Sequence, residues 1–531
     1  MDRRRKFWGW GYEDQRLTPG EQRMIRAIGA SQFKVAQFEE TPVPQVGEIA
    51  LARPRLSIPR ALAGILTTDP YERLLHTYGR SLKDYIRMFA RDFRPAPDLV
   101  AYPHSAEDVA AVLAWANDEN AAIIPCGGGT SVVGGIEAAV GDGFSGAVSL
   151  DLGKLARVVE VDDVSRAARI EAGILGPALE AALKPAGLTL RHFPQSFEFS
   201  TLGGWIATRS GGHYATLYTQ IDDFVESLRV VTPRGIVETR RLPASGAGPA
   251  PDRLFIGSEG ALGVITDAWV RLQRRPTFRA AASVHFPTFL TGAEAVRVIS
   301  QAGLYPANVR LLEPLEGAIA GAGDGSRALL VLAFESADHP VEAALARGLE
   351  ICADHGGTFA REAEGGAKGG AAAVWRNTFI RMPYFKEFQV AIGILSATFE
   401  TAITWDRFAP FYAGVKAAAE AAIVAATGKP GVVTCRFTHV YPDGPAPYFT
   451  WHAMGHKAAL LEQAQAIAAA AADAIETSGG TVTHHHAVGR DHMPWYVKER
   501  PALFGAALAA AKAELDPAGL LNPGVLVPAR P

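Results

Sequence analysis

The spacing of apolar residues divides the chain into a short N-terminal stretch and a long region of alternating strands and helices. Up to residue 93, prolines are scattered and helical spacing is brief, as around residues 75–86. Apolar residues that recur every three or four positions predict helix, whereas short apolar runs bounded by glycine or proline predict strands. We therefore expect residues 1–93 to form an irregular, partly helical segment.

From Pro97 onward, short apolar runs alternate with helical patterns and glycine-rich loops. Residues 105–108 have the Ser-x-x-Asp form that begins helices, and helical apolar spacing continues to Ala116. Residues 175–183 carry a second helical pattern. Runs typical of strands lie at residues 100–103, 122–125, 148–152, 168–172, 224–232 and 263–272. This mixture predicts an α+β ligand-binding domain over residues 94–275.

A second α+β unit is predicted after Arg275-Pro276. Its strand-like runs lie at residues 281–286, 328–334, 388–395 and 431–438. The alanine-rich stretch 457–475 has apolar residues at helical spacing, so we predict a packed helix there. Helix-stop and turn residues follow residue 501. We expect residues 276–500 to form the second domain and residues 501–531 to return to the first.

Composition and charge narrow the class of protein. The 531 residues, 48% of them hydrophobic, are enough for about two or three compact units. The 52 Lys+Arg against 55 Asp+Glu give a net charge of −3, so no basic field is available to bind nucleic acid. Cys126, Cys352 and Cys435 are odd in number and far apart, which favours a reducing compartment. We expect a cytoplasmic protein without a signal peptide, a transmembrane helix or a peroxisomal C-terminal signal.

Three glycine clusters in the first domain are the main chemical signal. They occupy residues 125–135, 195–212 and 257–266. Consecutive glycines allow several backbone N–H groups to converge on an anion. The first cluster lacks the Gly-Lys-Ser/Thr ending of a nucleoside-triphosphate phosphate loop. A Gly-x-Gly-x-x-Gly match at residues 141–146 leads into a strand rather than a helix, so we interpret it as coincidental.

In this order and spacing, the three clusters resemble the flavin-binding domain of the vanillyl-alcohol oxidase / p-cresol methylhydroxylase (PCMH) superfamily. The resemblance implies a PCMH-type FAD-binding domain over residues 94–275, an α+β substrate cap over residues 276–500 and non-covalently bound FAD. A long, doubly anionic cofactor needs several donor loops, which agrees with the glycine pattern. The cofactor-binding residues so implied are Pro125, Cys126, Gly127, Gly128, Gly129, Thr130, Ser131, Gln195, Ser196, Phe197, Glu198, Phe199, Ser200, Thr201, Thr208, Arg209, Ser210, Gly211, Glu259, Gly260, Ala261, Leu262, Gly263, Val264 and Ile265.

Two histidine-containing stretches in the cap distinguish branches of this superfamily. Its D-2-hydroxyacid dehydrogenases use His and Glu in two such motifs to hold a metal. Here Tyr448 stands where the second metal histidine is expected, and His485 where the Glu is expected. Loss of the carboxylate weakens a site for a hard metal, whereas the phenol adds a proton-transfer group.

These substitutions make the chain similar to the alkyldihydroxyacetonephosphate synthase (alkylglycerone-phosphate synthase) family over nearly its whole length. Residues 7–12, 198–205, 379–381 and 435–438 carry further likeness. The resemblance implies an acid/base Tyr448 and a substrate-phosphate Arg381. The remaining implied site residues are Arg310 for activity, His192 near the flavin and substrate, and His484, His485 and His486 in the catalytic site.

The implied reaction exchanges the acyl group of acyl-dihydroxyacetone phosphate for a fatty alcohol, in ether lipid synthesis. In this family the flavin N5 attacks C1 of the substrate, so an adduct forms on N5 and there is no net redox. Because the ordinary pKa of a phenol is about 10, Tyr448 needs a neighbouring cation or histidine to activate it. We expect small-molecule substrates, a homodimer and peripheral membrane contact through which the acyl chain arrives.

Two other functions remain open. An FAD-dependent D-2-hydroxyacid oxidoreductase of lactate or glycolate type is favoured if His439 and His485 bind a metal, because the synthase pattern has no histidine at position 439. A non-catalytic flavin-binding protein is favoured if Tyr448 and Arg381 lie away from the flavin. For the synthase-like site, we expect no bound metal.

Several of these side chains also have purely structural interpretations. If the three adjacent histidines form a strand, their side chains alternate, so we expect one or two to be functional and one structural. His452 and His456 are predicted to be surface residues of a helix. Arg436 is equally compatible with a structural ion pair, and Cys126 is expected to pack rather than react.

Overall fold

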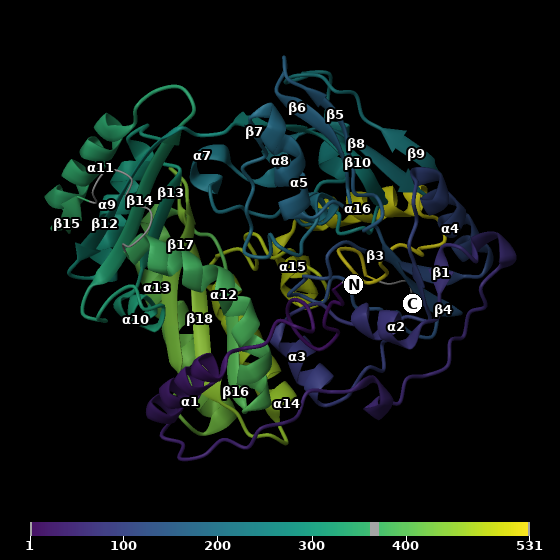
Figure 1. The fold of residues 1–531 in the computed structure, drawn as a ribbon, viewed down its shortest axis with the longest axis horizontal. Helices are drawn as coiled ribbons and strands as arrows, with labels where there is room; N and C mark the ends of the chain where they lie inside the picture. Colours follow the sequence, from purple (N-terminus) through teal and green to yellow (C-terminus); the bar gives the residue numbers. More distant parts are fainter. Residues whose placement is uncertain (1–2, 362–370, 529–531) are drawn as a thin grey trace.

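The computed structural model describes residues 3–361 and 371–528, and they form an α+β protein, as predicted (Figure 1). A four-stranded and a five-stranded sheet lie on one side of the molecule and a seven-stranded sheet on the other. The shorter elements are α7 (Ala215–Tyr218), α8 (Ile221–Phe224), α10 (Pro314–Ile319) and a two-stranded sheet of β7 (Leu188–Thr189) and β11 (Gln273–Arg274).

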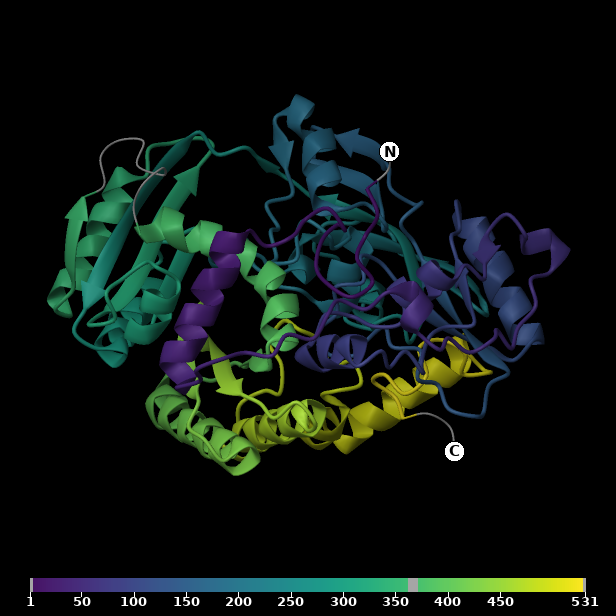
Figure 2. The ribbon, with the colours of Figure 1, turned by 60° about the horizontal axis from the view of Figure 1, so that its bottom comes forward.

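The N-terminal segment is irregular and partly helical, which confirms the prediction for this region. Its helices are α1 (Pro19–Phe33), α2 (Pro70–Leu75) and α3 (Leu82–Phe89). Thr18 begins α1 through a capping box with Glu21, the arrangement that satisfies free N–H groups at a helix start. Figure 2 shows α1 beside the helix α12 (Ala371–Ala391). Ile25 and Phe33 of α1 share an apolar cluster with Tyr384 and Phe388 of α12.

The glycine-rich clusters connect the strands of the first two sheets. The four-stranded sheet has the order β1 (Leu66–Thr67), β2 (Leu99–Ala101), β4 (Gly146–Asp151) and β3 (Ala121–Cys126). The five-stranded sheet has the order β5 (Val158–Asp162), β6 (Ala167–Glu171), β10 (Val264–Arg271), β8 (Val225–Thr232) and β9 (Gly235–Glu238). Helices α4 (Ala106–Asp118), α5 (Gly176–Leu183) and α6 (Leu202–Thr208) complete this half. The helix start predicted at Ser105 is confirmed, because its hydroxyl accepts from the N–H of Asp108.

The seven-stranded sheet is antiparallel and carries several of the predicted site residues. Its order is β15 (Thr358–Arg361), β12 (Phe278–Phe286), β14 (Ala328–Ser336), β13 (Asn308–Leu312), β17 (Val432–Val440), β18 (Pro445–Met454) and β16 (Ile394–Glu400). Helices α9 (Phe289–Gln301), α11 (Glu342–Asp354), α13 (Trp405–Thr427) and α14 (Leu460–Thr477) pack against it. Phe437, Phe449 and Trp451 point into this apolar core. Because neighbours on a strand alternate, Arg436, Tyr448 and Thr450 point to the other face.

Two predictions in the cap are wrong. Residues 388–391 end α12, and the strand begins only at Ile394, after Gly393 turns the chain with φ +79°. The apolar run at the end of α12 reflects burial in a helix, which a short run cannot distinguish from burial in a strand. His452 lies on β18 and not on a surface helix. His456 follows that strand, and its Nε2 is 3.0 Å from the carbonyl oxygen of Thr427.

Helix α13 is long and apolar enough to cross a membrane, alone among the described helices. Its Phe408, Phe411, Val415 and Ile423 are buried in the core beside β17 and β18. This packing accounts for the apolar residues at these four positions.

The C-terminal stretch contains α15 (Met493–Glu499) and α16 (Ala502–Leu515) and then pairs with β3. The N–H of Ile123 donates to the Leu520 carbonyl at 2.9 Å, and the N–H of Asn522 donates to the Ile123 carbonyl at 2.8 Å. Residues 520–522 thereby lie beside the strand that carries the first glycine cluster.

Candidate active site

A cavity of about 410 Å³ lies between the glycine clusters and the seven-stranded sheet. All three clusters line it, together with side chains of β13, β16, β17 and β18. Residues of α1 and α12 line its apolar end. The cavity therefore brings the predicted flavin loops and the predicted catalytic strands to one place.

The first two glycine clusters are packed directly against each other. A Cβ on Gly128 would lie 1.5 Å from the carbonyl oxygen of Phe199, and one on Gly127 would lie 2.2 Å from Oγ1 of Thr201. Gly129 has φ +68° and lines the cavity, and no other atom lies within 4 Å of the position its Cβ would take. The backbone at Gly129 is thus open to a ligand, which is the donor geometry a pyrophosphate needs. We conclude that this site fits FAD.

Most of the predicted flavin residues line the cavity. They are Pro125–Ser131, Gln195, Ser196, Ser200, Thr201, Thr208, Ser210, Gly211, Glu259, Gly260 and Gly263–Ile265. Cys126 is buried, and burial raises the pKa of its thiol to about 12, so it is neutral and packs as predicted.

The other predicted flavin residues lie outside this lining. Phe199 packs edge-on against Trp10, at 5.4 Å between ring centroids, and Phe197 stacks on Trp205. Glu198 accepts a hydrogen bond from Tyr384 at 3.0 Å, and Arg209 pairs with Asp222 at 3.1 Å. Ala261 and Leu262 are fully buried.

Tyr448 is buried at the cavity wall beside a cation. Its hydroxyl donates to Oγ1 of Thr398 at 2.9 Å, and the Arg436 guanidinium lies 4.1 Å from the centre of its ring. Burial raises the pKa of Tyr448, while Arg436 and the Thr398 hydroxyl oppose that rise. Arg436 also forms a buried ion pair with Glu316. Tyr448 is therefore a protonated phenol at neutral pH, and Arg436 favours its ionised form when the proton leaves.

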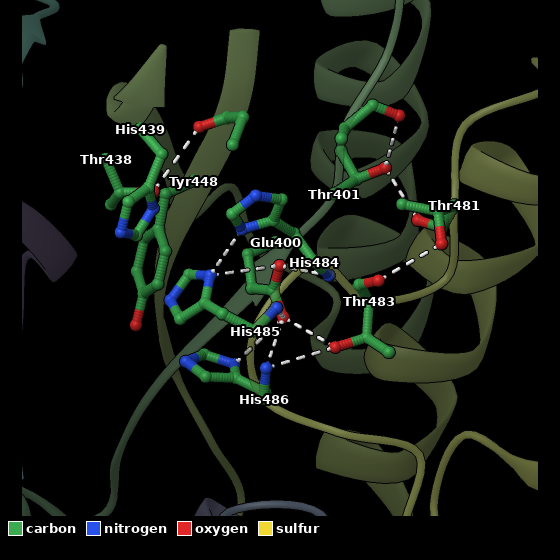
Figure 3. A network of polar contacts seen from close by, with 12 residues as sticks. Glu400, Thr401, Thr438, His439, Tyr448, Thr481, Thr483, His484, His485 and His486 are labelled. Carbon is green, nitrogen blue, oxygen red and sulfur yellow. Dashed lines mark hydrogen bonds and ion pairs between the residues drawn. The ribbon is translucent and has the colours of Figure 1, made fainter. Parts of the chain in front are cut away.

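The three consecutive histidines lie on a loop that a buried carboxylate holds in place (Figure 3). Glu400, at the end of β16, accepts from the backbone N–H groups of His484, His485 and His486 at 2.6, 3.2 and 3.0 Å. It also accepts from the Thr483 hydroxyl at 2.7 Å. Burial opposes ionisation of Glu400, but His486, His484 and these hydrogen bonds together hold its pKa below the usual value. Glu400 is therefore an anion that fixes the loop.

The side chains of the loop differ in direction. Those of His485 and His486 line the cavity, and their ring centroids lie 5.9 and 5.6 Å from that of Tyr448. His484 lies outside the lining, with its Nε2 2.9 Å from the Tyr441 hydroxyl. The expected alternation along a strand does not apply, because these residues form no strand. Burial lowers the pKa of His486 to about 4 and that of His485 well below its usual value, so both rings are neutral near pH 7.

Of the three remaining predicted site residues, one lines the cavity and two lie outside its lining. Arg310, on β13, is buried and lines the cavity, and burial followed by repulsion from Arg436 lowers its pKa to about 9. His192 lies behind the lining, with its Nε2 2.8 Å from the Ser210 hydroxyl. Arg381 lies outside the lining and pairs with Glu21 of α1 at 2.5 Å.

Sequence reasoning missed three polar residues of this site. Lys386 of α12 and His452 of β18 both line the cavity. No carboxylate of the described chain lies within ion-pair distance of Lys386, and burial lowers its pKa to about 8. The third is Glu400, which is buried; a buried Glu needs partners, and those of Glu400 lie far away in the sequence, so no local pattern marks it.

His439, His484 and His485 form a group whose ring nitrogens lie within 4.8 Å of one another. Such a group offers three nitrogen ligands for a metal. However, His439 already uses both nitrogens, with Nδ1 3.1 Å from the Thr438 hydroxyl and Nε2 3.1 Å from the Gly212 carbonyl. A metal there must displace one of these bonds.

Comparison with known proteins identifies the class to which this site belongs. A family model described as "FAD binding domain" matches residues 97–240, and one described as "FAD linked oxidases, C-terminal domain" matches residues 275–526. The solved p-cresol methylhydroxylase, 15% identical, shares the fold with a TM-score of 0.70 over 88% of this chain and 95% of its own. The chain is an FAD-dependent enzyme with the PCMH-type fold.

Closer relatives define the family within this class. The alkyldihydroxyacetonephosphate synthase of Caenorhabditis elegans is 31% identical over 485 residues, which cover 86% of this chain and 80% of the relative. A solved alkyldihydroxyacetonephosphate synthase is 26% identical and superposes with a TM-score of 0.82 over 98% of both chains. The chain belongs to the alkyldihydroxyacetonephosphate synthase family, and its cofactor is FAD.

Proposed function

We propose that this enzyme exchanges the acyl group of acyl-dihydroxyacetone phosphate for a fatty alcohol. The observation that carries the proposal is one cavity in which flavin loops, the Tyr448–histidine cluster and an apolar end meet. In the overall exchange, the C1–O bond to the fatty acid breaks, a C1–O bond to the alcohol forms, and the fatty acid leaves. Electrons balance without an oxidant or reductant.

When bound, FAD would supply N5 as the nucleophile toward C1 of the substrate, so that no net redox occurs. The protein must then hold and return a C1 proton. Tyr448 is placed for this role, because its hydroxyl lies at the cavity wall beside Arg436 and two neutral imidazoles. Arg436 stabilises the phenolate that takes up the C1 proton, and neutral His485 and His486 can accept hydrogen bonds beside it.

The substrate phosphate is a dianion and needs cations inside the cavity. Lys386 and Arg310 line it, whereas Arg381 is engaged with Glu21 outside the lining. We assign the phosphate to Lys386 and Arg310, and we assign Arg381 to the contact that joins α12 to α1. A lysine acts as a point charge toward phosphate, and an arginine adds directional donors.

The apolar end of the cavity fits a long hydrocarbon chain. Met24, Ile25, Ile28 and Phe33 of α1 line it, together with Phe385 of α12. Met24 and Ile28 are 46% and 45% exposed, so this end opens to the surface beside α1. Lipid substrates would enter here, and peripheral contact with a lipid surface at α1 is part of the proposal.

The test is to add acyl-dihydroxyacetone phosphate and a labelled fatty alcohol to the purified holoenzyme. We expect fatty acid release and label in the ketone phosphate in equal amounts, with no electron acceptor needed. Reduction of a dye by D-lactate or glycolate, with no label transfer, would show a hydroxyacid oxidoreductase instead. The Tyr448→Phe variant is the matched control, since it should retain FAD.

A further inference from the structure

The N-terminal segment, residues 3–17, packs on the glycine loop Gly127–Ser131 and lies outside both matched family models. Nη2 of Arg5 donates to the Gly128 carbonyl at 3.2 Å. The backbone N–H of Arg80, between α2 and α3, donates to the Ser131 carbonyl at 2.6 Å. Two arginines therefore hold this loop from its two ends.

Arg80 is buried, 2% exposed, and borders the cavity. Among the described residues, its guanidinium donates to the backbone carbonyls of Gly79 at 2.6 Å, Tyr78 at 3.2 Å and Lys6 at 3.0 Å. The Arg5 guanidinium lies 4.3 Å from the centre of the Phe199 ring. The Nε atoms of both arginines are buried without a hydrogen-bond partner in the described chain.

No carboxylate of the described residues lies within 4.0 Å of either guanidinium. Asp151 and Glu387 are the acids whose charges act on Arg5 and Arg80, respectively, and each has another partner. Asp151 pairs with His76 at 2.8 Å, and Glu387 pairs with Lys6 at 2.7 Å. Burial, and then repulsion from Arg80, lowers the pKa of Arg5 to about 10. The buried Arg80 and the half-buried Arg5 thus repel each other, which is costly unless an anion joins them.

We propose that Arg5 and Arg80 supply the counter-charge for the pyrophosphate of FAD, Arg80 from the cavity wall and Arg5 from behind Gly128. The N-terminal segment is then part of the flavin site. The pyrophosphate is favoured over a substrate phosphate because both arginines hold the glycine loop. Arg5 acts through that loop as a positioning charge, whereas Arg80 can face the anion directly.

The test measures FAD release from the holoenzyme, followed as the rise of free-FAD fluorescence after dilution. We expect Arg5→Gln and Arg80→Gln to release FAD about tenfold faster, the factor for losing one charge-assisted interaction. Arg5→Lys, which keeps the charge, should stay close to wild type. Arg3→Gln is the matched control, because Arg3 pairs with Asp14 at 2.8 Å on the surface.

The outcomes separate charge from packing. Release from Arg5→Gln at the wild-type rate overturns the proposal, and so does equally fast release from Arg5→Lys and Arg5→Gln, which points to packing alone. The proposal is also overturned if Arg80→Gln raises KM for the acyl substrate and leaves FAD release unchanged. Arg80 would then bind the substrate phosphate and not the pyrophosphate of FAD. If Arg80→Gln does not fold, the three variants at Arg5 and Arg3 decide.

Discussion

Replacing Glu400 by glutamine tests whether this buried anion positions the catalytic loop. Its Oε2 accepts from the N–H of His484, and Oε1 accepts from Thr483, His485 and His486. A glutamine keeps one oxygen, but its NH₂ group faces an N–H instead of accepting from it. Each hydrogen bond to a charged group contributes about 1.5–3 kcal/mol. Losing one of these hydrogen bonds and weakening the other three costs about 2–4 kcal/mol. This lowers the population of the correctly formed loop about 30- to 900-fold.

The assay is label exchange between the fatty alcohol and acyl-dihydroxyacetone phosphate, with FAD content measured in parallel. We expect kcat to fall within that range while FAD is retained. The acidic limb of the pH profile should also shift to lower pH, because Glu400 raises the pKa of His486. Glu499→Gln is the matched control, since Glu499 accepts from Thr481 and Val482 just before the loop. A Glu400→Gln variant with kcat within twofold of wild type would refute the positioning role.

Three further predictions concern the cavity. Tyr448→Phe should retain FAD and lose at least about 100-fold in exchange rate, because the proton carrier is lost; normal turnover would contradict the role of Tyr448. Lys386→Met should raise KM for the acyl-ketone phosphate about tenfold or more and leave FAD binding unchanged; an unchanged KM would assign the phosphate elsewhere. Burial raises the pKa of Glu259 from 4.5 to about 7, so its contribution to stability is complete below pH 4.5 and is lost as pH rises through about 7. Glu259→Gln should therefore flatten the fall in thermal midpoint between pH 5 and 8, and an unchanged pH dependence would contradict this.

The glycine loops could be predicted from sequence because their chemistry is local. Consecutive glycines mark close backbone approach wherever the loop lies in the fold, and Gly127 and Gly128 pack within contact of the second cluster. The strands of the first domain were predictable for a related reason, since short apolar runs ended at glycine or proline. The end of α12 was mistaken for a strand because its apolar run is buried in a helix.

The polar residues that complete the site could not be found this way, because their roles depend on contacts far apart in sequence. Glu400 acts on a loop 84 residues later. Lys386 reaches the cavity only because α12 crosses the seven-stranded sheet, whereas Arg381, five positions earlier, turns toward α1. Family likeness alone favoured Arg381 for the phosphate.

The side-chain amide of Asn522 donates to the carbonyls of Gly135 and Glu259, at 2.9 and 2.8 Å, and joins the first and third glycine clusters. Arg5 holds the first cluster from the opposite end of the sequence. During synthesis on the ribosome, the flavin pocket therefore stays incomplete until residue 522 has emerged. Cofactor capture should follow translation, and FAD should be absent from nascent chains that stop before α16.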